Sequence, residues 1–162
     1  MSENEIGSLG LKTEAPGDTL MLCSFRLAER WFGLDAADIF EIRVLEALTP
    51  VAGAPAWLKG LVNIRGEILT LLDLSPLLEP AGAPAQGPGF VVLLGHLDER
   101  LCLLVDEVGD EFELANAGLE ALPISVGPLL TSLGRAFWSG FPGGLVLFDT
   151  EALFRPGLGQ QL

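Results

Sequence analysis

The chain has 162 residues, of which 49% are hydrophobic, so it can bury a core and is not generally disordered. Its formal net charge is −13, with 22 Asp and Glu against 9 Lys and Arg, and it lacks the basic stripe by which proteins bind nucleic acid or anionic membranes. The longest apolar runs fall far short of the ~20 residues of a membrane-spanning helix, and the acidic start lacks the features of a secretory signal. The sequence predicts a cytoplasmic protein that neither binds nucleic acid nor inserts into a membrane.

The first half of the folded sequence reads as short strands. Residues 1–18 are predicted to be a flexible acidic tail, residues 19–155 to fold, and residues 156–162 to form a second tail. Alternating apolar and polar residues predict a hairpin over 20–35 and a strand over 39–44, whose two faces carry Ile39 and Glu41 on one side and Phe40 on the other. After a Pro/Gly loop, residues 57–74 predict a second hairpin with Arg65 at its bend.

A linker-like stretch, AGAPAQGPG at 81–89, divides the folded part into approximate halves, 19–88 and 89–155. The second half begins with strands joined by a polar turn, DER at 98–100. A Pro/Gly-broken segment follows over 115–135, and the chain closes with a hairpin and a short helix. A short helix is also predicted at the end of the first half, with Ser75 as its N-cap.

The two halves resemble each other. FRLAER at 25–30 matches GHLDER at 95–100, and the hairpin and short helix that follow Trp57 match those that follow Phe137. This weak internal duplication predicts two small β-subdomains of similar plan, built as barrels or sandwiches. The absence of a long amphipathic helix in the sequence argues against a doubly wound α/β fold.

Catalytic or metal chemistry has little support in the sequence. His96 is a lone histidine in an apolar strand, and Cys23 and Cys102 have no metal-binding spacing, which predicts buried reduced thiols. The acidic run over 106–113 lacks the pattern of a calcium loop and is interpreted as a solvated strand edge or turn. Asp73 and Asp149 precede the two short helices and are predicted to cap them. We therefore predict no cofactor, no metal and no enzymatic activity.

Arg65 is the candidate functional residue, because a cation beside an apolar hairpin must reach water or pair with a carboxylate. Glu41 and Glu67 are both candidate partners. A guanidinium can bind a carboxylate bidentately and fix the hairpin against a neighbouring strand. Two interpretations stay open at this point: a local salt bridge, or a rigid polar element on a surface that binds a partner.

Four blocks carry a family resemblance, and they occur in order over about residues 20–155: FRLAERWFGLDAADIFEI, TPVAGAPAWLKGLVNIRGEILTLLDL, LCLLVDEVGDEFEL and FWSGFPGGLVLFDTEALF. They are similar to the CheW-like domain of bacterial chemotaxis. The resemblance implies an all-β fold of two SH3-like five-stranded β-barrels packed on a shared hydrophobic core, with short helices. It also implies a non-catalytic adaptor that links methyl-accepting chemoreceptors, through their signalling tip, to the regulatory domain of a CheA-type histidine kinase.

The resemblance also implies which residues meet partners. Arg65 and Glu41 match a salt-bridged pair of the family, which makes the Glu41–Arg65 pair the preferred interpretation. The implied partner-binding residues are Ile39, Phe40, Glu41, Arg65, Gly66, Phe90 and Val91. The receptor groove is implied only as a region between the two barrels. A ring assembly of CheW-like domains, and a location at the inner face of the membrane through receptor arrays, would follow.

The sequence departs from the family pattern at three positions. Thr70 stands where the family usually has Pro, Ser75 where a basic residue follows DL, and Cys102 where a Gly precedes the VD strand. Paralogues of the coupling protein serve other pathways, such as pilus or gliding motility and surface sensing. Two alternatives therefore stay open: a CheW-like paralogue that binds one partner and insulates or competes, and a small β-barrel ligand-binding protein or enzyme that shares only the fold.

Overall fold

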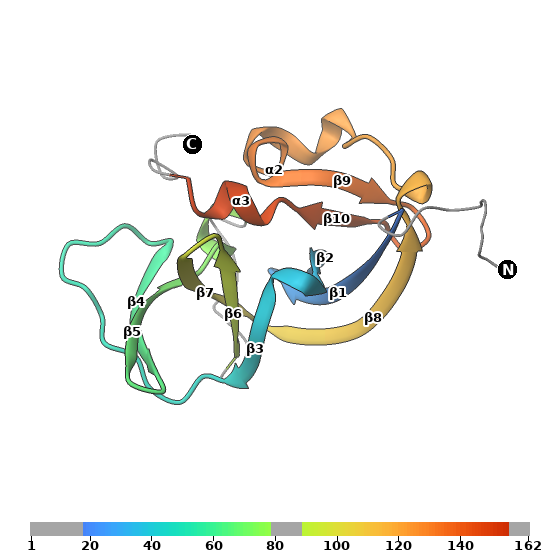
Figure 1. The fold of residues 1–162 in the computed structure, drawn as a ribbon. Helices are drawn as coiled ribbons and strands as arrows, with labels where there is room; N and C mark the ends of the chain where they lie inside the picture. Colours follow the sequence, from blue (N-terminus) through green and yellow to red (C-terminus); the bar gives the residue numbers. More distant parts are fainter. Residues whose placement is uncertain (1–17, 79–88, 156–162) are drawn as a thin grey trace, which may run out of the picture.

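The computed structural model describes residues 18–78 and 89–155, which form two five-stranded sheets (Figure 1). Sheet A has the strand order β8-β1-β2-β10-β9, and sheet B has the order β3-β6-β7-β5-β4. The strands of sheet A are β1 (Thr19–Leu27), β2 (Arg30–Asp35), β8 (Glu107–Ala115), β9 (Gly134–Trp138) and β10 (Leu145–Phe148). Those of sheet B are β3 (Ile39–Val44), β4 (Leu58–Ile64), β5 (Glu67–Leu72), β6 (Phe90–His96) and β7 (Glu99–Val105). The prediction of an all-β fold with two five-stranded units is confirmed.

The sheets do not follow the predicted division at residues 88 and 89. Sheet A joins the hairpin β1–β2 to strands β8, β9 and β10, whereas sheet B joins the hairpin β6–β7 to β3, β4 and β5. Each half of the chain therefore gives two strands to one sheet and three to the other. The strands that the duplication predicts to be equivalent still hold matching places in the two sheets. Each sheet contains one parallel pair, β2 with β10 in sheet A and β7 with β5 in sheet B. The two predicted tails and most of the predicted linker lie outside the described residues.

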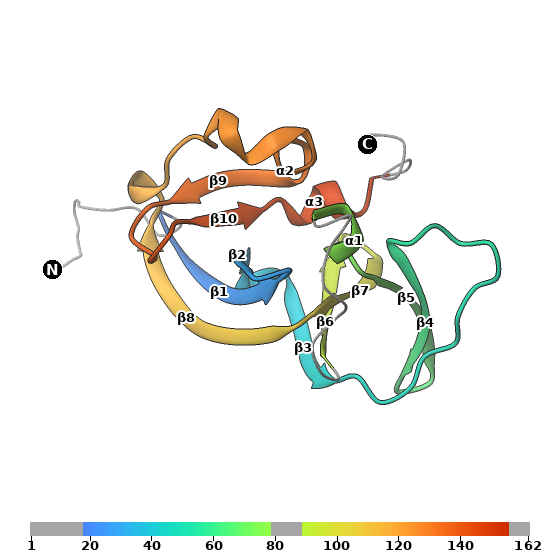
Figure 2. The ribbon, with the colours of Figure 1, turned by 180° about the vertical axis from the view of Figure 1, so that it is seen from behind.

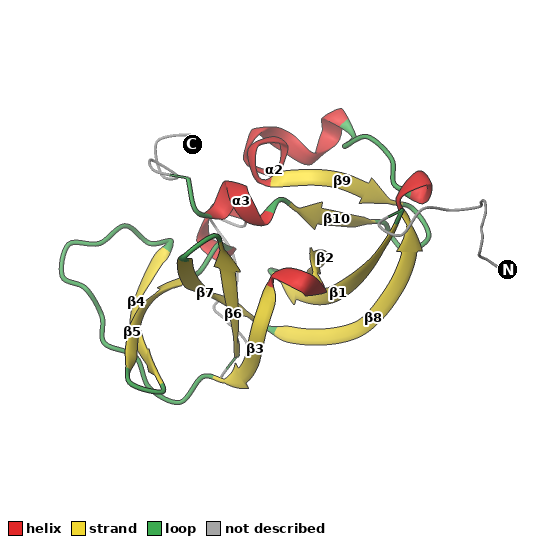
Figure 3. Ribbon diagram, in the orientation of Figure 1, coloured by secondary structure: helices red, strands yellow, loops and turns green. Residues whose placement is uncertain are grey.

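Short helices lie beside and between the sheets (Figure 2 and Figure 3). They are the α-helices α1 (Ser75–Leu78), α2 (Gly127–Leu133) and α3 (Thr150–Leu153), and the 3-10 helices η1 (Ala36–Asp38), η2 (Asn116–Gly118) and η3 (Ile124–Val126). The backbone N–H of Ser75 donates to Asp73 Oδ1 at 3.0 Å, and that of Glu151 donates to Asp149 Oδ1 at 3.1 Å. Both carboxylates thus accept a backbone hydrogen bond at the start of a helix. Ser75, predicted as an N-cap, is instead the first residue of α1. The helix α2 was not expected in the Pro/Gly-broken segment; its proline lies in the first turn, where a missing N–H costs nothing.

Tight two-residue turns close three of the hairpins. Arg65 and Gly66 join Ile64 to Glu67, and both have positive φ, 54° and 89°. This left-handed pair matches the right-handed twist of the flanking strands. The β6–β7 turn pairs His96 with Glu99, so its bend is one residue earlier than predicted.

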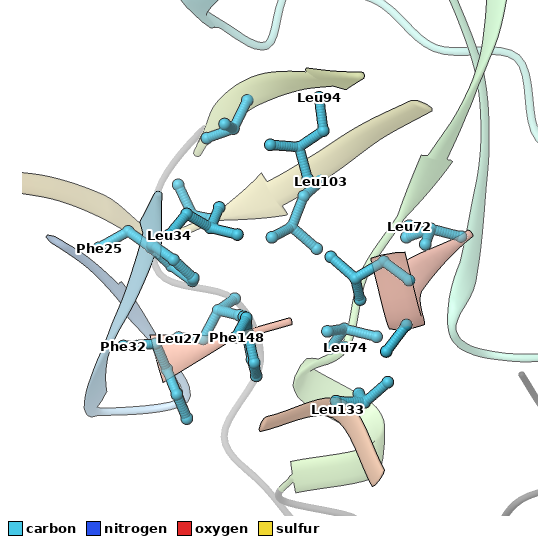
Figure 4. Packing of buried hydrophobic residues seen from close by; sticks show 14 of the residues in the cluster. Phe25, Leu27, Phe32, Leu34, Leu72, Leu74, Leu94, Leu103, Leu133 and Phe148 are labelled. Atoms are coloured by element: carbon cyan, nitrogen blue, oxygen red, sulfur yellow. The ribbon is translucent and has the colours of Figure 1, made fainter. Parts of the chain in front are cut away.

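The main hydrophobic core lies between the two sheets (Figure 4), where Phe25, Phe32 and Phe148 from sheet A pack with leucines of sheet B. Successive side chains of β7 alternate between this shared core and a second cluster inside sheet B. Leu103 faces the shared core, whereas Cys102 faces the inner cluster and is fully buried.

Burial raises the pKa of the Cys102 thiol to about 11, and burial, with the charge of Glu111, also raises the pKa of Cys23. The predicted pair of buried free thiols is confirmed.

Candidate partner-binding surface

Strand β3 forms one edge of sheet B and turns an apolar face outward. Among the described strands it pairs only with β6, and its residues alternate between half-buried and exposed. Phe40 is 60% exposed, Ile42 37% and Val44 48%. Natural proteins usually protect such edges with charge or cover them, because an exposed apolar edge invites association. The outward face of β3 is therefore a candidate docking surface.

Phe40 is held in a fixed position although most of its side chain is exposed. Its ring covers Gly95 of β6, where even a Cβ atom would collide with it. On the ring lies the guanidinium of Arg100, 4.7 Å from the centroid, a cation–π contact. Arg100 is in turn 3.6 Å from Glu67 in an ion pair. The ring is thus pre-ordered for a partner, which lowers the entropy lost on binding.

A second polar network surrounds Glu41, on the other face of β3. Arg43 Nε donates to Glu41 Oε2 at 2.9 Å, Arg43 Nη2 donates to the same oxygen, and Arg65 Nη2 lies 3.4 Å from Glu41 Oε1. The hydrogen bond from Arg43 holds the pKa of Glu41 below its ordinary value, with the charges of Arg43 and Arg65 adding to this effect against a smaller loss of hydration. The carboxylate therefore stays ionised and links the β4–β5 turn to the β3 edge.

The structure distinguishes between the two predicted partners of Arg65. Glu41 is its ion-pair partner, whereas Glu67 pairs with Arg100. The side chain of Arg65 remains 77% exposed, so it reaches water as well as a carboxylate. The turn itself is fixed by the backbone N–H of Gly66, which donates to Asn63 Oδ1 at 2.8 Å.

The remaining predicted site residues lie deeper. Ile39 and Phe90 are half-buried and pack against the shared core. Val91 is only 2% exposed and belongs to the inner cluster of sheet B, so its side chain cannot contact a partner. This burial argues against a side-chain contact at Val91; residues 90–94 of β6 are all apolar, and such a run does not show from its sequence which face is outward.

Two residues of the surface were missed. Arg43 is the nearer partner of Glu41, and Arg100 holds the Phe40 ring. The period of a β-strand could have suggested Arg43, because residues two apart share a face. Nothing local in the sequence points Arg100 at Phe40, since the contact depends on the pairing of β3 with β6 and of β6 with β7.

Within residues 18–78 and 89–155, no cluster of three or more His, Cys, Asp or Glu side chains could hold a metal ion. His96 lies at the end of β6 beside the ring of Phe154, 5.8 Å between centroids. Among the same residues no helix is long and apolar enough to cross a membrane. The acidic run over 106–113 lies largely on β8, which is an edge strand as predicted.

Comparison with known proteins places the chain in a family. The model of the CheW-like domain matches residues 22–155. Chemotaxis protein CheW of Treponema pallidum (strain Nichols) is 23% identical over 145 residues, covering 85% of this chain and 83% of that protein. Protein PilI of Pseudomonas aeruginosa is 32% identical over 84 residues, 52% of this chain and 47% of that protein. The crystal structure of the scaffolding protein TtCheW from Thermoanaerobacter tengcongensis has the same fold, with a TM-score of 0.71 at 21% identity over 80% of this chain and 88% of that one.

The fold and the length of the family match show that this chain belongs to the CheW-like domain family. The members of this family are non-catalytic scaffold and adaptor proteins. The prediction that the chain is not an enzyme is therefore confirmed by its family.

Proposed function

We propose that this chain is a cytoplasmic adaptor that couples methyl-accepting chemoreceptors to a CheA-type histidine kinase in a chemosensory array. Its family and its relatives named for chemotaxis support a scaffold role. The observation that carries the proposal is the apolar outward face of β3, next to the network of Glu41, Arg43 and Arg65. An apolar centre with a charged rim is the usual anatomy of a protein interface.

The kinase is the partner proposed for this surface. Phe40 and Ile42 would supply the apolar anchors, with Arg65 and Gly66, at the turn that Glu41 links to this strand, as further contacts. Ile39 and Phe90 would support the anchors from below, since they pack between this edge and the shared core. The receptor tip would bind in the region between the two sheets. Ring assembly with other CheW-like domains, and a place at the inner face of the membrane, would follow from these contacts.

The proposed mechanism is mechanical: the two sheets share one core, through which they would act as a rigid link. The adaptor would hold receptor and kinase in a fixed geometry. It can transmit the state of the receptor only through different affinities for the receptor's two states, since no other effect shifts that equilibrium.

The test is a calorimetric titration of the chain against the regulatory domain of the cognate kinase and, separately, against a receptor signalling-tip fragment. Binding to both, weakened by a charge on β3, is the expected result. Binding to the kinase alone would indicate the insulating or competing paralogue. A folded chain that binds neither would overturn the proposal and favour a small ligand-binding protein.

A further inference from the structure

The β6–β7 turn carries an exposed leucine whose side chain contributes little to the packing of its own chain. Leu97 is 90% exposed and has a φ of +55°, a conformation that disfavours any residue with a branched or bulky side chain. Its side chain therefore contributes little packing to the fold, and its backbone is strained. The next two residues, Asp98 and Glu99, are also exposed. The turn thus offers an apolar side chain followed by two carboxylates.

A surface pocket elsewhere has the complementary chemistry. It lies between α1 and the start of α2, has a volume of about 350 Å³, and is lined mainly by apolar side chains: Leu77, Leu78, Val126, Pro128, Leu129 and Leu130. This volume is at the small end of the range for ligand pockets, roughly 300–1,000 Å³, and suits one or two apolar side chains. Of the described residues in the lining, Arg30 alone is charged.

Arg30 is available to a partner. Its guanidinium lies over the ring of Phe32, 5.7 Å from the centroid, and among residues 18–78 and 89–155 no carboxylate forms an ion pair with it. An apolar segment with neighbouring acidic residues would fill the pocket and pair with Arg30. Removing Arg30 from water would then be offset by a charge-assisted hydrogen bond.

We propose that the β6–β7 turn of one copy of this chain docks in the α1–α2 pocket of a second copy, with Leu97 in the pocket and Asp98 or Glu99 on Arg30. The chain itself carries both complementary parts, which is the reason to name a second copy as the occupant. The contact joins two different surfaces. The copies therefore associate head to tail, or form a pair in which the turn of each copy docks in the pocket of the other. The contact uses none of Phe40, Ile42 and Arg65 directly, although Glu99 is followed by Arg100, whose guanidinium lies on the Phe40 ring.

The experiment is sedimentation velocity of the purified chain over a range of concentrations up to about 1 mM, the scale of weak association. We expect concentration-dependent self-association that Leu97→Gly weakens at least about tenfold. Glycine suits the positive φ, so this variant should keep the fold. Leu97→Met keeps an apolar side chain and should keep the association. Arg30→Glu should abolish it, whereas Lys59→Glu, an equal change of charge at an exposed position of β4, should not.

The decisive test reverses the charges on the two contacting surfaces in separate variants. Arg30→Glu alone and the double variant Asp98→Lys/Glu99→Lys alone should both be monomers, because each brings like charges together. An equimolar mixture of the two should associate again. A wild-type chain that stays monomeric at every concentration, a Leu97→Gly variant that associates like wild type, or a mixture that stays monomeric would each overturn the proposal. Acidic peptides from another protein would then be the remaining occupants of the pocket. Kinase binding of wild type and Leu97→Gly, measured separately, would distinguish failure of this proposal from failure of the proposed kinase contact.

Discussion

Strands β3 and β8 hold equivalent places in the two sheets, but the surface that β3 exposes to water is apolar, whereas the surface that β8 exposes is acidic. Each is an edge strand that pairs antiparallel with the first strand of a hairpin, β6 or β1. The edge of sheet B exposes Phe40, Ile42 and Val44. The edge of sheet A exposes carboxylates instead: Glu107, Asp110, Glu111 and Glu113.

An edge position in a sheet is therefore not enough by itself to make a strand associate with other chains. A charged edge resists pairing with other chains, whereas an apolar one permits it. The protein therefore has one edge suited to a partner and one protected by its charge. Substitutions that range from the core supporting both edges to a single ionised group would test this asymmetry.

Leu103→Ala should damage both edges together, because Leu103 is fully buried in the core that the sheets share. We expect a loss of about 2–5 kcal/mol in the free energy of unfolding, from the lost burial and the cavity left behind. Urea denaturation would measure it. A loss below ~1 kcal/mol would mean that the sheets do not depend on the shared core.

Ile42→Glu should give the β3 edge the character of β8. We expect kinase affinity to fall about 10- to 100-fold, because a carboxylate would replace an apolar anchor. Met21→Glu is the matched control, an exposed apolar residue on sheet A. Calorimetric titration of both variants would decide the matter. Equal losses in the two would show that the binding surface is not confined to the β3 edge.

Arg65→Ala should separate binding from folding. Its side chain is largely exposed, so the free energy of unfolding should change by less than ~1 kcal/mol. Kinase affinity should fall about three- to tenfold. Arg155→Ala, which removes another exposed ion pair, is the control. A folded Arg65→Ala variant with wild-type affinity would leave Arg65 with a local structural role alone.

Glu41→Gln should have a small effect that depends on pH. The folded-state pKa of Glu41 is lowered, first by its hydrogen bond to Arg43, from an ordinary value of 4.5. The stability it contributes is therefore present above that value and is lost as the pH falls through the lowered pKa. Thermal midpoints of wild type and variant should differ at neutral pH and converge in acid. A difference independent of pH would exclude the charge of Glu41 as its origin.

Local patterns predicted the strands, the turns and the caps, because these depend on neighbours in the sequence. The alternation in residues 39–44 correctly separated Phe40 from Glu41, and the turn at Arg65 and Gly66 followed from a glycine between two apolar runs. The pairing of strands depends on contacts between distant segments, which no local pattern contains. For this reason the exchange of strands between the halves, the burial of Val91 and the contact of Arg100 with Phe40 were not predicted.

The exchange of strands between the halves has a consequence for the chain during its synthesis. When residues up to 88 have left the ribosome, β1 and β2 still lack every other strand of sheet A, and β3, β4 and β5 lack the hairpin that joins them. Sheet A remains incomplete until β10, at Leu145–Phe148, is available. Because such long-range pairing is slow and the core is shared, a truncated chain should form neither sheet and expose no competent β3 edge. Unfinished chains would therefore not compete with the complete protein for its partners.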